Sequence, residues 1–88
     1  MTYVQKLIDQ TLSYAQEAAD VNNLDLRDTY IDDHRDFMII QNLILNDRWE
    51  AAGNYATLMD TLPREQIIEA IEMDYSACEV EAMGFILN

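Results

Sequence analysis

Apolar residues recur at helical spacing along this chain, most clearly in its first quarter. The residues on one side of a helical projection, at about 100° per residue, are Val4, Leu7, Ile8, Thr11, Leu12, Ala15, Ala18 and Ala19. Polar residues occupy the opposite side. Thr2 and Gln5 match a capping box, in which each side chain satisfies the other residue's free backbone N–H. The pattern predicts an amphipathic helix over residues 2–19, with Thr2 as its N-cap.

The segment that follows has no regular pattern and contains turn-forming residues. Asn22 and Asn23 favour a turn because their side chains hydrogen-bond to the nearby backbone. Residues 20–28 are therefore predicted to connect two helices, with Leu24 and Leu26 holding the connection against the core.

A second helix is predicted over residues 29–45, because apolar side chains from Phe37 to Leu45 cover most of its circumference. A helix that is apolar nearly all round is normally buried. We expect it at the centre of the fold or at an oligomer interface. A strand over residues 37–40 is the alternative, since a short apolar run is ambiguous by periodicity.

Two more helices are predicted, over residues 48–61 and 64–83, on either side of Pro63. Asp47 is the expected cap of the first, because acidic residues are favoured at helix starts. Helical spacing from Ile67 to Met83 favours a single last helix.

A break near Asp74 is the alternative, because Ser76 and Glu79 match a second capping box. Gly84 suits a left-handed C-terminal cap, with Phe85 folding back onto the helix. Taken together, the pattern predicts one all-α domain over residues 1–88, a compact bundle of about four helices.

Charge changes the picture more than any other property of the composition. The chain has 17 Asp and Glu residues against five Lys and Arg, a net charge of −12, but its hydrophobic fraction of 50% is too high for a disordered acidic tail. This charge argues against direct binding to nucleic acid or to anionic lipid, because both would repel the chain. A protein partner with a basic surface is expected instead.

Cysteine usage and the chain start point to a cytoplasmic protein. Cys78 is the one cysteine, so it forms no internal disulfide and is expected to be a buried apolar residue in a reducing compartment. The N-terminal residues do not show the basic region followed by an apolar stretch that is typical of a signal peptide. The longest apolar run, residues 37–40, is far too short to span a membrane.

A row of acidic residues marks the last predicted helix. After Arg64 there are six acids and no Lys or Arg. If residues 64–83 form one helix, four of the acids lie in a stripe about 20 Å long: Glu65, Glu69, Glu72 and Glu79. Ordinary solvated faces mix charges of both signs, so the stripe is a candidate for binding a basic groove in place of phosphates. A solvated helix face is the alternative.

A second acidic cluster surrounds the only histidine. It comprises Asp28, Asp32, Asp33 and Asp36, answered only by Arg27 and Arg35. Much of it falls in the first turns of the second predicted helix, where the helix dipole favours negative charge. A metal or acid–base site at Asp33, His34 and Asp36 has no supporting second His or Glu-x-x-His pair, so we expect His34 to be a surface or capping residue and expect no metal.

No nucleophile motif, phosphate-binding loop or dinucleotide fingerprint is present. We therefore expect no enzymatic activity and no cofactor. The Lys-free acidic segment from Glu65 to Glu81, the Asp28–Asp36 cluster and the helical pattern resemble the small acidic proteins that phages encode against host defence, including DNA-mimic anti-restriction and anti-CRISPR proteins. The resemblance is one of size, charge and class, and no motif matches residue by residue.

The most favoured function is that of a non-enzymatic binding protein that inhibits a host protein by occupying a basic surface, such as a nucleic-acid channel. The expected contact residues are Glu65, Glu69, Glu72, Glu79, Asp32, Asp33 and Asp36. The alternative is a structural or adaptor subunit that dimerises or docks through apolar surface. The residues expected to carry that alternative are Phe37, Ile39, Leu43, Trp49 and the tail Phe85, Ile86 and Leu87.

Overall fold

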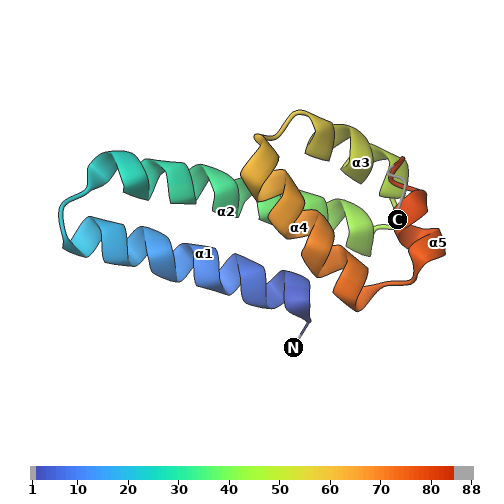
Figure 1. Ribbon diagram of the computed structural model, residues 1–88, viewed down its shortest axis with the longest axis horizontal. Coiled ribbons are helices and arrows are strands. Elements are labelled where there is room, and N and C mark those ends of the chain that lie inside the picture. The colour runs from blue at the N-terminus through green and yellow to red at the C-terminus, as the bar shows by residue number, and fades with distance from the viewer. Residues whose placement is uncertain (1, 85–88) are drawn as a thin grey trace.

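The computed structural model describes residues 2–84 as five helices joined by short connections (Figure 1). The helices are α1 (Tyr3–Asp20), α2 (Leu24–Leu45), α3 (Trp49–Thr57), α4 (Thr61–Asp74) and α5 (Ala77–Glu81). No strand occurs among the described residues, so the all-α prediction is confirmed. The alternative of a strand over residues 37–40 is wrong, because these residues lie within α2.

The start of α1 confirms the predicted N-cap but only half of the capping box. The Thr2 hydroxyl accepts a hydrogen bond from the backbone N–H of Gln5 (3.1 Å). The Gln5 side chain is used elsewhere: its amide donates to Asp9 (3.0 Å) and its carbonyl accepts from Gln41 of α2 (2.9 Å). Gln5 thus ties α1 to α2 rather than closing its own helix start.

The connection between α1 and α2 is much shorter than the predicted residues 20–28. Asn22 has a φ of 60°, a left-handed conformation that Asn tolerates, and the Asn23 side chain caps α2 by accepting from the Leu26 backbone N–H (3.3 Å). Helix α2 consequently starts at Leu24, five residues earlier than predicted. Leu24 and Leu26 are 46% and 41% exposed, so neither holds a loop against the core.

The start of α3 also differs from the prediction. Asp47 does not cap it, because Asp47 adopts a left-handed conformation with a φ of 59°. The N-cap is Arg48, whose side chain makes no capping hydrogen bond. The Asp47 carboxylate instead accepts a hydrogen bond from the Trp49 indole N–H (3.1 Å).

The segment predicted as one helix over residues 64–83 is two helices. Helix α4 begins at Thr61, with Pro63 buried in its first turn, and ends at Asp74; Tyr75 is extended. The Ser76–Glu79 capping box is present with both of its hydrogen bonds and starts α5. The prediction of a single helix is therefore wrong, and the alternative of a break near Asp74 is confirmed. Gly84 has a φ of 91°, as expected for a left-handed residue, while Phe85 lies outside the described residues.

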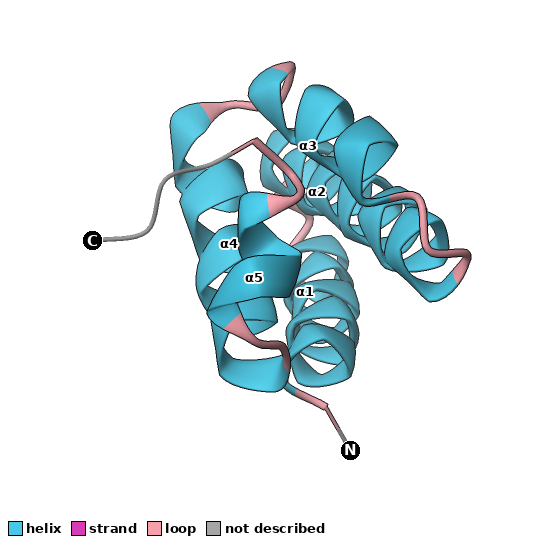
Figure 2. Cartoon of the chain, turned by 90° about the vertical axis from the view of Figure 1, so that its right-hand side faces the viewer, coloured by secondary structure: helices cyan, strands magenta, loops and turns pink. Residues whose placement is uncertain are grey.

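The core forms where the helices cross. Helices α1 and α2 form an antiparallel hairpin; α4 packs on α1, and α3 packs on the second half of α2 (Figures 1 and 2). The largest fully buried side chains are Phe37, Ile40, Ile67, Ile71 and Val80. Cys78 is exposed, contrary to expectation, because the break after α4 turns Val80 and Met83 inward in its place.

Candidate partner-binding surfaces

Three of the predicted contact residues form a continuous exposed row on α4. Glu65, Glu69 and Glu72, here called the α4 row, are exposed and lie opposite the buried side chains of Ile67 and Ile71. At about 1.5 Å per residue the row extends about 10 Å along the helix. The three ion pairs among residues 2–84 all involve Arg27 or Arg35 of α2, so no carboxylate of the row is paired.

Glu79 does not belong to this row. It lies on α5, beyond the break at Tyr75 and Ser76. Its carboxylate accepts hydrogen bonds from the Ser76 hydroxyl (3.0 Å) and backbone N–H (3.4 Å). The predicted stripe of four acids is therefore shortened to three, because it assumed a single helix, and Glu79 has a local role in starting α5.

The aspartates of α2 lie beside the connection between α3 and α4. Asp32, Asp33 and Asp36 join Asp60, the N-cap of α4, around a recess of about 260 Å³, here called the Asp recess. Asp60 was not singled out in the sequence, because it comes from an element 24 residues beyond Asp36. Only the fold brings these four carboxylates to one place.

Repulsion and burial both act on the Asp recess. Burial raises the pKa of Asp33 above its usual value, and the negative charges of Asp36, Asp60 and Asp32 raise it further. Asp36 accepts a short hydrogen bond from the Tyr55 hydroxyl (2.6 Å). That bond is the main cause of the raised pKa of Tyr55, with burial second. Asp36 therefore helps hold α3 against α2, in addition to its place in the predicted contact surface.

Among the described residues, Arg35 is the only cation that forms an ion pair with a carboxylate of the Asp recess. Its guanidinium lies 3.7 Å from Asp32 and 3.9 Å from Asp36, and all three groups are on α2. Both pairs are long, and the Arg35 side chain is 65% exposed, so each contributes little to stability. A basic side chain from another protein would meet carboxylates that the chain itself neutralises poorly.

His34 does not join the neighbouring aspartates in a metal or acid–base site. Its Nδ1 atom lies 3.1 Å from the Ile8 carbonyl oxygen of α1. A carbonyl oxygen only accepts, so Nδ1 carries the donated proton. Within residues 2–84, no three His, Cys, Asp or Glu side chains are grouped closely enough to hold a metal ion. His34 thus links α2 to α1.

The apolar residues predicted to carry an adaptor surface are mostly part of the interior. Phe37 is fully buried, and Ile39, Leu43 and Trp49 are half-buried. Residues 85–87 lie outside the described part of the chain. The exposed apolar residues of α2 that share one side are Leu24, Ile31, Met38 and Leu45, here called the α2 stripe. Their seven-residue spacing is visible in the sequence and is the signal that would have revealed them.

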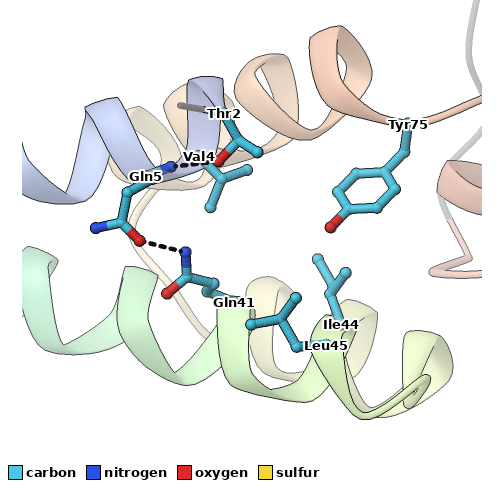
Figure 3. A pocket seen from close by; sticks show the side chains of 7 residues that line it. All are labelled: Thr2, Val4, Gln5, Gln41, Ile44, Leu45 and Tyr75. Carbon is cyan, nitrogen blue, oxygen red and sulfur yellow. Dashed lines mark hydrogen bonds between the residues drawn. The ribbon is translucent and has the colours of Figure 1, made fainter.

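A separate recess of about 290 Å³ lies where the start of α1 meets the end of α2. Figure 3 shows the Tyr75 ring reaching into it, opposite the hydrogen-bonded Gln5 and Gln41 amides. The Trp49 ring meets Tyr75 edge to face, with centroids 5.0 Å apart. Burial raises the pKa of Tyr75, followed by the charges of Asp74 and Glu79. The lining residues carry no charge, so this recess is no part of the acidic surfaces.

No helix within residues 2–84 is long and apolar enough to cross a membrane. No protein-family model, curated protein or solved structure matches the chain.

Proposed function

We propose that this chain is a non-enzymatic acidic binding protein that inhibits a host protein by occupying a basic surface. The observation that carries the proposal is the α4 row of Glu65, Glu69 and Glu72, which is exposed and has no cationic partner among the described residues. The Asp recess supplies a second group of carboxylates on the same molecule.

The spacing of the α4 row suits a groove that normally holds phosphates. Residues three and four apart on a helix are neighbours, so the three carboxylates repel one another in the free protein. Lys and Arg side chains of a basic groove would relieve that repulsion. Arg binds carboxylate and phosphate with the same planar, two-pronged geometry, so a nucleic-acid-binding groove is a natural target.

The net charge of −12 adds a long-range attraction to such a target. Electrostatic steering raises association rates and is screened by salt. Binding driven in this way weakens steeply as ionic strength rises. The proposed activity is that of the acidic phage anti-defence proteins which the chain resembles in size, charge and class.

A docking or structural subunit is the second candidate, and the exposed α2 stripe favours it. Apolar docking responds weakly to salt, because it does not depend on attraction between net charges. Salt dependence therefore separates the two candidates.

The test compares the wild type with two triple variants of equal net charge. One variant, Glu65→Gln, Glu69→Gln and Glu72→Gln, neutralises the α4 row. The matched control, Asp9→Asn, Glu17→Gln and Asp20→Asn, removes three exposed acids of α1. Each protein is immobilised and exposed to nuclease-treated host lysate at low and high salt, with heparin as a competing polyanion.

The proposal expects one or more basic proteins to be captured at low salt and released by high salt or heparin. Association rates measured with the purified captured protein should fall for the α4-row variant by more than for the α1 control. Equal rates for the wild type and the α4-row variant at low salt would overturn the proposal. Equal losses in both variants would show that net charge alone, and not the row, drives binding.

A further inference from the structure

The outer side of α2 carries an apolar stripe that no helix within residues 2–84 covers. Leu24, Ile31, Met38 and Leu45 recur every seven residues and are 46%, 46%, 49% and 71% exposed. They span all 22 residues of α2, from its first residue to its last, about 30 Å at 1.5 Å per residue. Figure 1 shows the first half of α2 paired with α1 alone. Two helices that pack along their length repeat apolar residues at two positions in every seven. The stripe supplies one of these positions, and polar residues flank it at positions 27–28, 34–35 and 41–42.

The stripe is also nearly neutral, which is unusual on a chain of net charge −12. The Arg27 guanidinium lies 2.9 Å from the Asp28 carboxylate, and Arg35 is paired with Asp32 and Asp36. From residue 37 to residue 46 the sequence has no charged residue at all. Repulsion between two copies of this chain is therefore weakest along this side of α2.

We propose that the α2 stripe is the interface of a homodimer, in which α2 packs antiparallel to α2 of a second copy about a two-fold axis at Met38. The groove along the stripe, about 570 Å³, is centred on Met38, where the two-fold axis of such a pair would pass. Seven of its eight lining residues map onto one another when the helix direction is reversed. The pairs are Ile31 with Leu45, His34 with Asn42, and Arg35 with Gln41, with Met38 on the axis.

This register pairs apolar side chains with each other and keeps like charges apart at the centre of the groove. Ile31 of each copy meets Leu45 of the other. Each Arg35 lies beside the uncharged amide of Gln41 instead of beside the second Arg35, so no like charges meet at the centre. A two-fold interface contains every such contact twice.

Charge complementarity also favours the antiparallel direction. A parallel pair would place Asp25, Asp28 and Asp32 of the two copies side by side. In the antiparallel pair, the acidic first half of each α2 lies along the uncharged second half of the other.

The dimer and the proposed acidic binding respond to salt in opposite directions. Two chains of charge −12 repel at long range, and added salt screens that repulsion while leaving the apolar contact in place. Dimerisation should strengthen as salt rises, whereas capture by a basic partner should weaken. The two proposals therefore fail independently of each other.

The first test is analytical ultracentrifugation of the full chain over a concentration series at low and high salt. Met38→Glu places a charge on the two-fold axis and should raise the dimer dissociation constant by about tenfold or more, because buried like charges oppose each other. Met73→Glu is the matched control: Met73 is 59% exposed on α4, its neighbours in a surface recess come from α1 and α4, and the substitution adds the same charge.

A wild type that stays monomeric at high concentration and high salt overturns the proposal, and a partner other than a second copy would then cover the stripe. If Met38→Glu and Met73→Glu weaken the dimer equally, the proposed interface is overturned. Circular dichroism of both variants establishes that each remains folded.

The second test fixes the register by disulfide cross-linking in a Cys78→Ser background, since Cys78 is exposed and would react. Met38→Cys should cross-link to itself across the axis under mild oxidation. Ile31→Cys alone should not, but a mixture of Ile31→Cys and Leu45→Cys chains should form the mixed dimer. Efficient cross-linking of Ile31→Cys to itself, without that of Met38→Cys, contradicts the antiparallel register.

Discussion

The side chain of Asp74, the last residue of α4, accepts a hydrogen bond from the backbone N–H of Val4 in the first turn of α1, with 2.9 Å between Oδ2 and the nitrogen. Its other oxygen, Oδ1, accepts from the Tyr3 backbone N–H at 2.8 Å. The first N–H groups of a helix have no partner within that helix and attract negative charge. Asp74 thus joins two helices about 70 residues apart in sequence, and one acid of the Lys-free segment has a structural role.

Replacing Asp74 should destabilise the protein. Asp74→Ala removes both hydrogen bonds and leaves the α1 start capped by Thr2 alone, so we expect a loss of about 1–2 kcal/mol in the free energy of unfolding. Urea denaturation measures it. Glu72→Ala, an exposed acid on the same helix, is the control and should change stability by about 0.5 kcal/mol or less. Equal effects of the two substitutions would refute the capping role.

Gly53 should be sensitive to the smallest substitution. A Cβ at this position of α3 would overlap the carbonyl group of Met83, which is backbone and gives way only if the chain after α5 shifts. Gly→Ala in a helix interior normally stabilises by about 1 kcal/mol. Here we expect Gly53→Ala to destabilise by about 1–3 kcal/mol, because overpacking outweighs the gain.

The neighbouring exposed Asn54→Ala is the control for Gly53→Ala, since it gains helix propensity without the overlap. It should be neutral or slightly stabilising in thermal unfolding followed by circular dichroism. A Gly53→Ala protein as stable as the wild type would show that the segment around Met83 does not pack against α3.

Two kinds of sequence pattern predicted this fold: the helical spacing of apolar residues and the local capping motifs. Periodicity found every long helix, because each has a buried side. It missed the first turns of α2, where Leu24 faces water and no core pattern exists. The helical spacing of apolar residues also continues across Tyr75 and Ser76, although the helix ends there. It therefore led to the prediction of one helix where there are two. The capping box at Ser76 is a local signal and located the break correctly.

The candidate surfaces divide in the same way. Glu65, Glu69 and Glu72 are within two turns of one helix, so their shared side follows from helical geometry. Asp60 joins Asp32, Asp33 and Asp36 only through tertiary packing, which a sequence pattern does not contain. Glu79 was assigned to the row because the helix was predicted to continue.

Neutralising Asp33 should stabilise the protein in a pH-dependent way. The pKa of Asp33 is raised above 3.8 in the folded state by burial and by Asp36, Asp60 and Asp32. The folded state therefore binds more protons than the unfolded state just above pH 3.8, and the Asp33 penalty grows as pH rises through that window. At neutral pH we expect Asp33→Asn to gain at most about 0.5 kcal/mol, because water screens this half-buried group.

That gain should disappear below about pH 3.8, where Asp33 is protonated in both states. Urea unfolding of wild type and Asp33→Asn across pH 3 to 7 measures the difference. A gain that is the same at both ends of the range would point to packing rather than charge. A loss of stability at neutral pH would contradict the repulsion in the Asp recess.

Neutralising the α4 row should stabilise the free protein while weakening its proposed binding. Glu65 and Glu69 are four residues apart, and Glu69 and Glu72 are three apart, so each pair repels. The triple Gln variant should unfold at a higher temperature at low salt, with a gain of about 0.2–0.5 kcal/mol for each repulsive pair removed. High salt should abolish the difference between variant and wild type, because screening removes the repulsion from the wild type as well.

If this more stable variant associates more slowly with a basic partner, the slower association cannot result from misfolding. The effect on function would then be separate from the effect on stability. If the variant is no more stable at low salt, the three carboxylates do not repel one another appreciably, and relief of their repulsion no longer supports the proposed function.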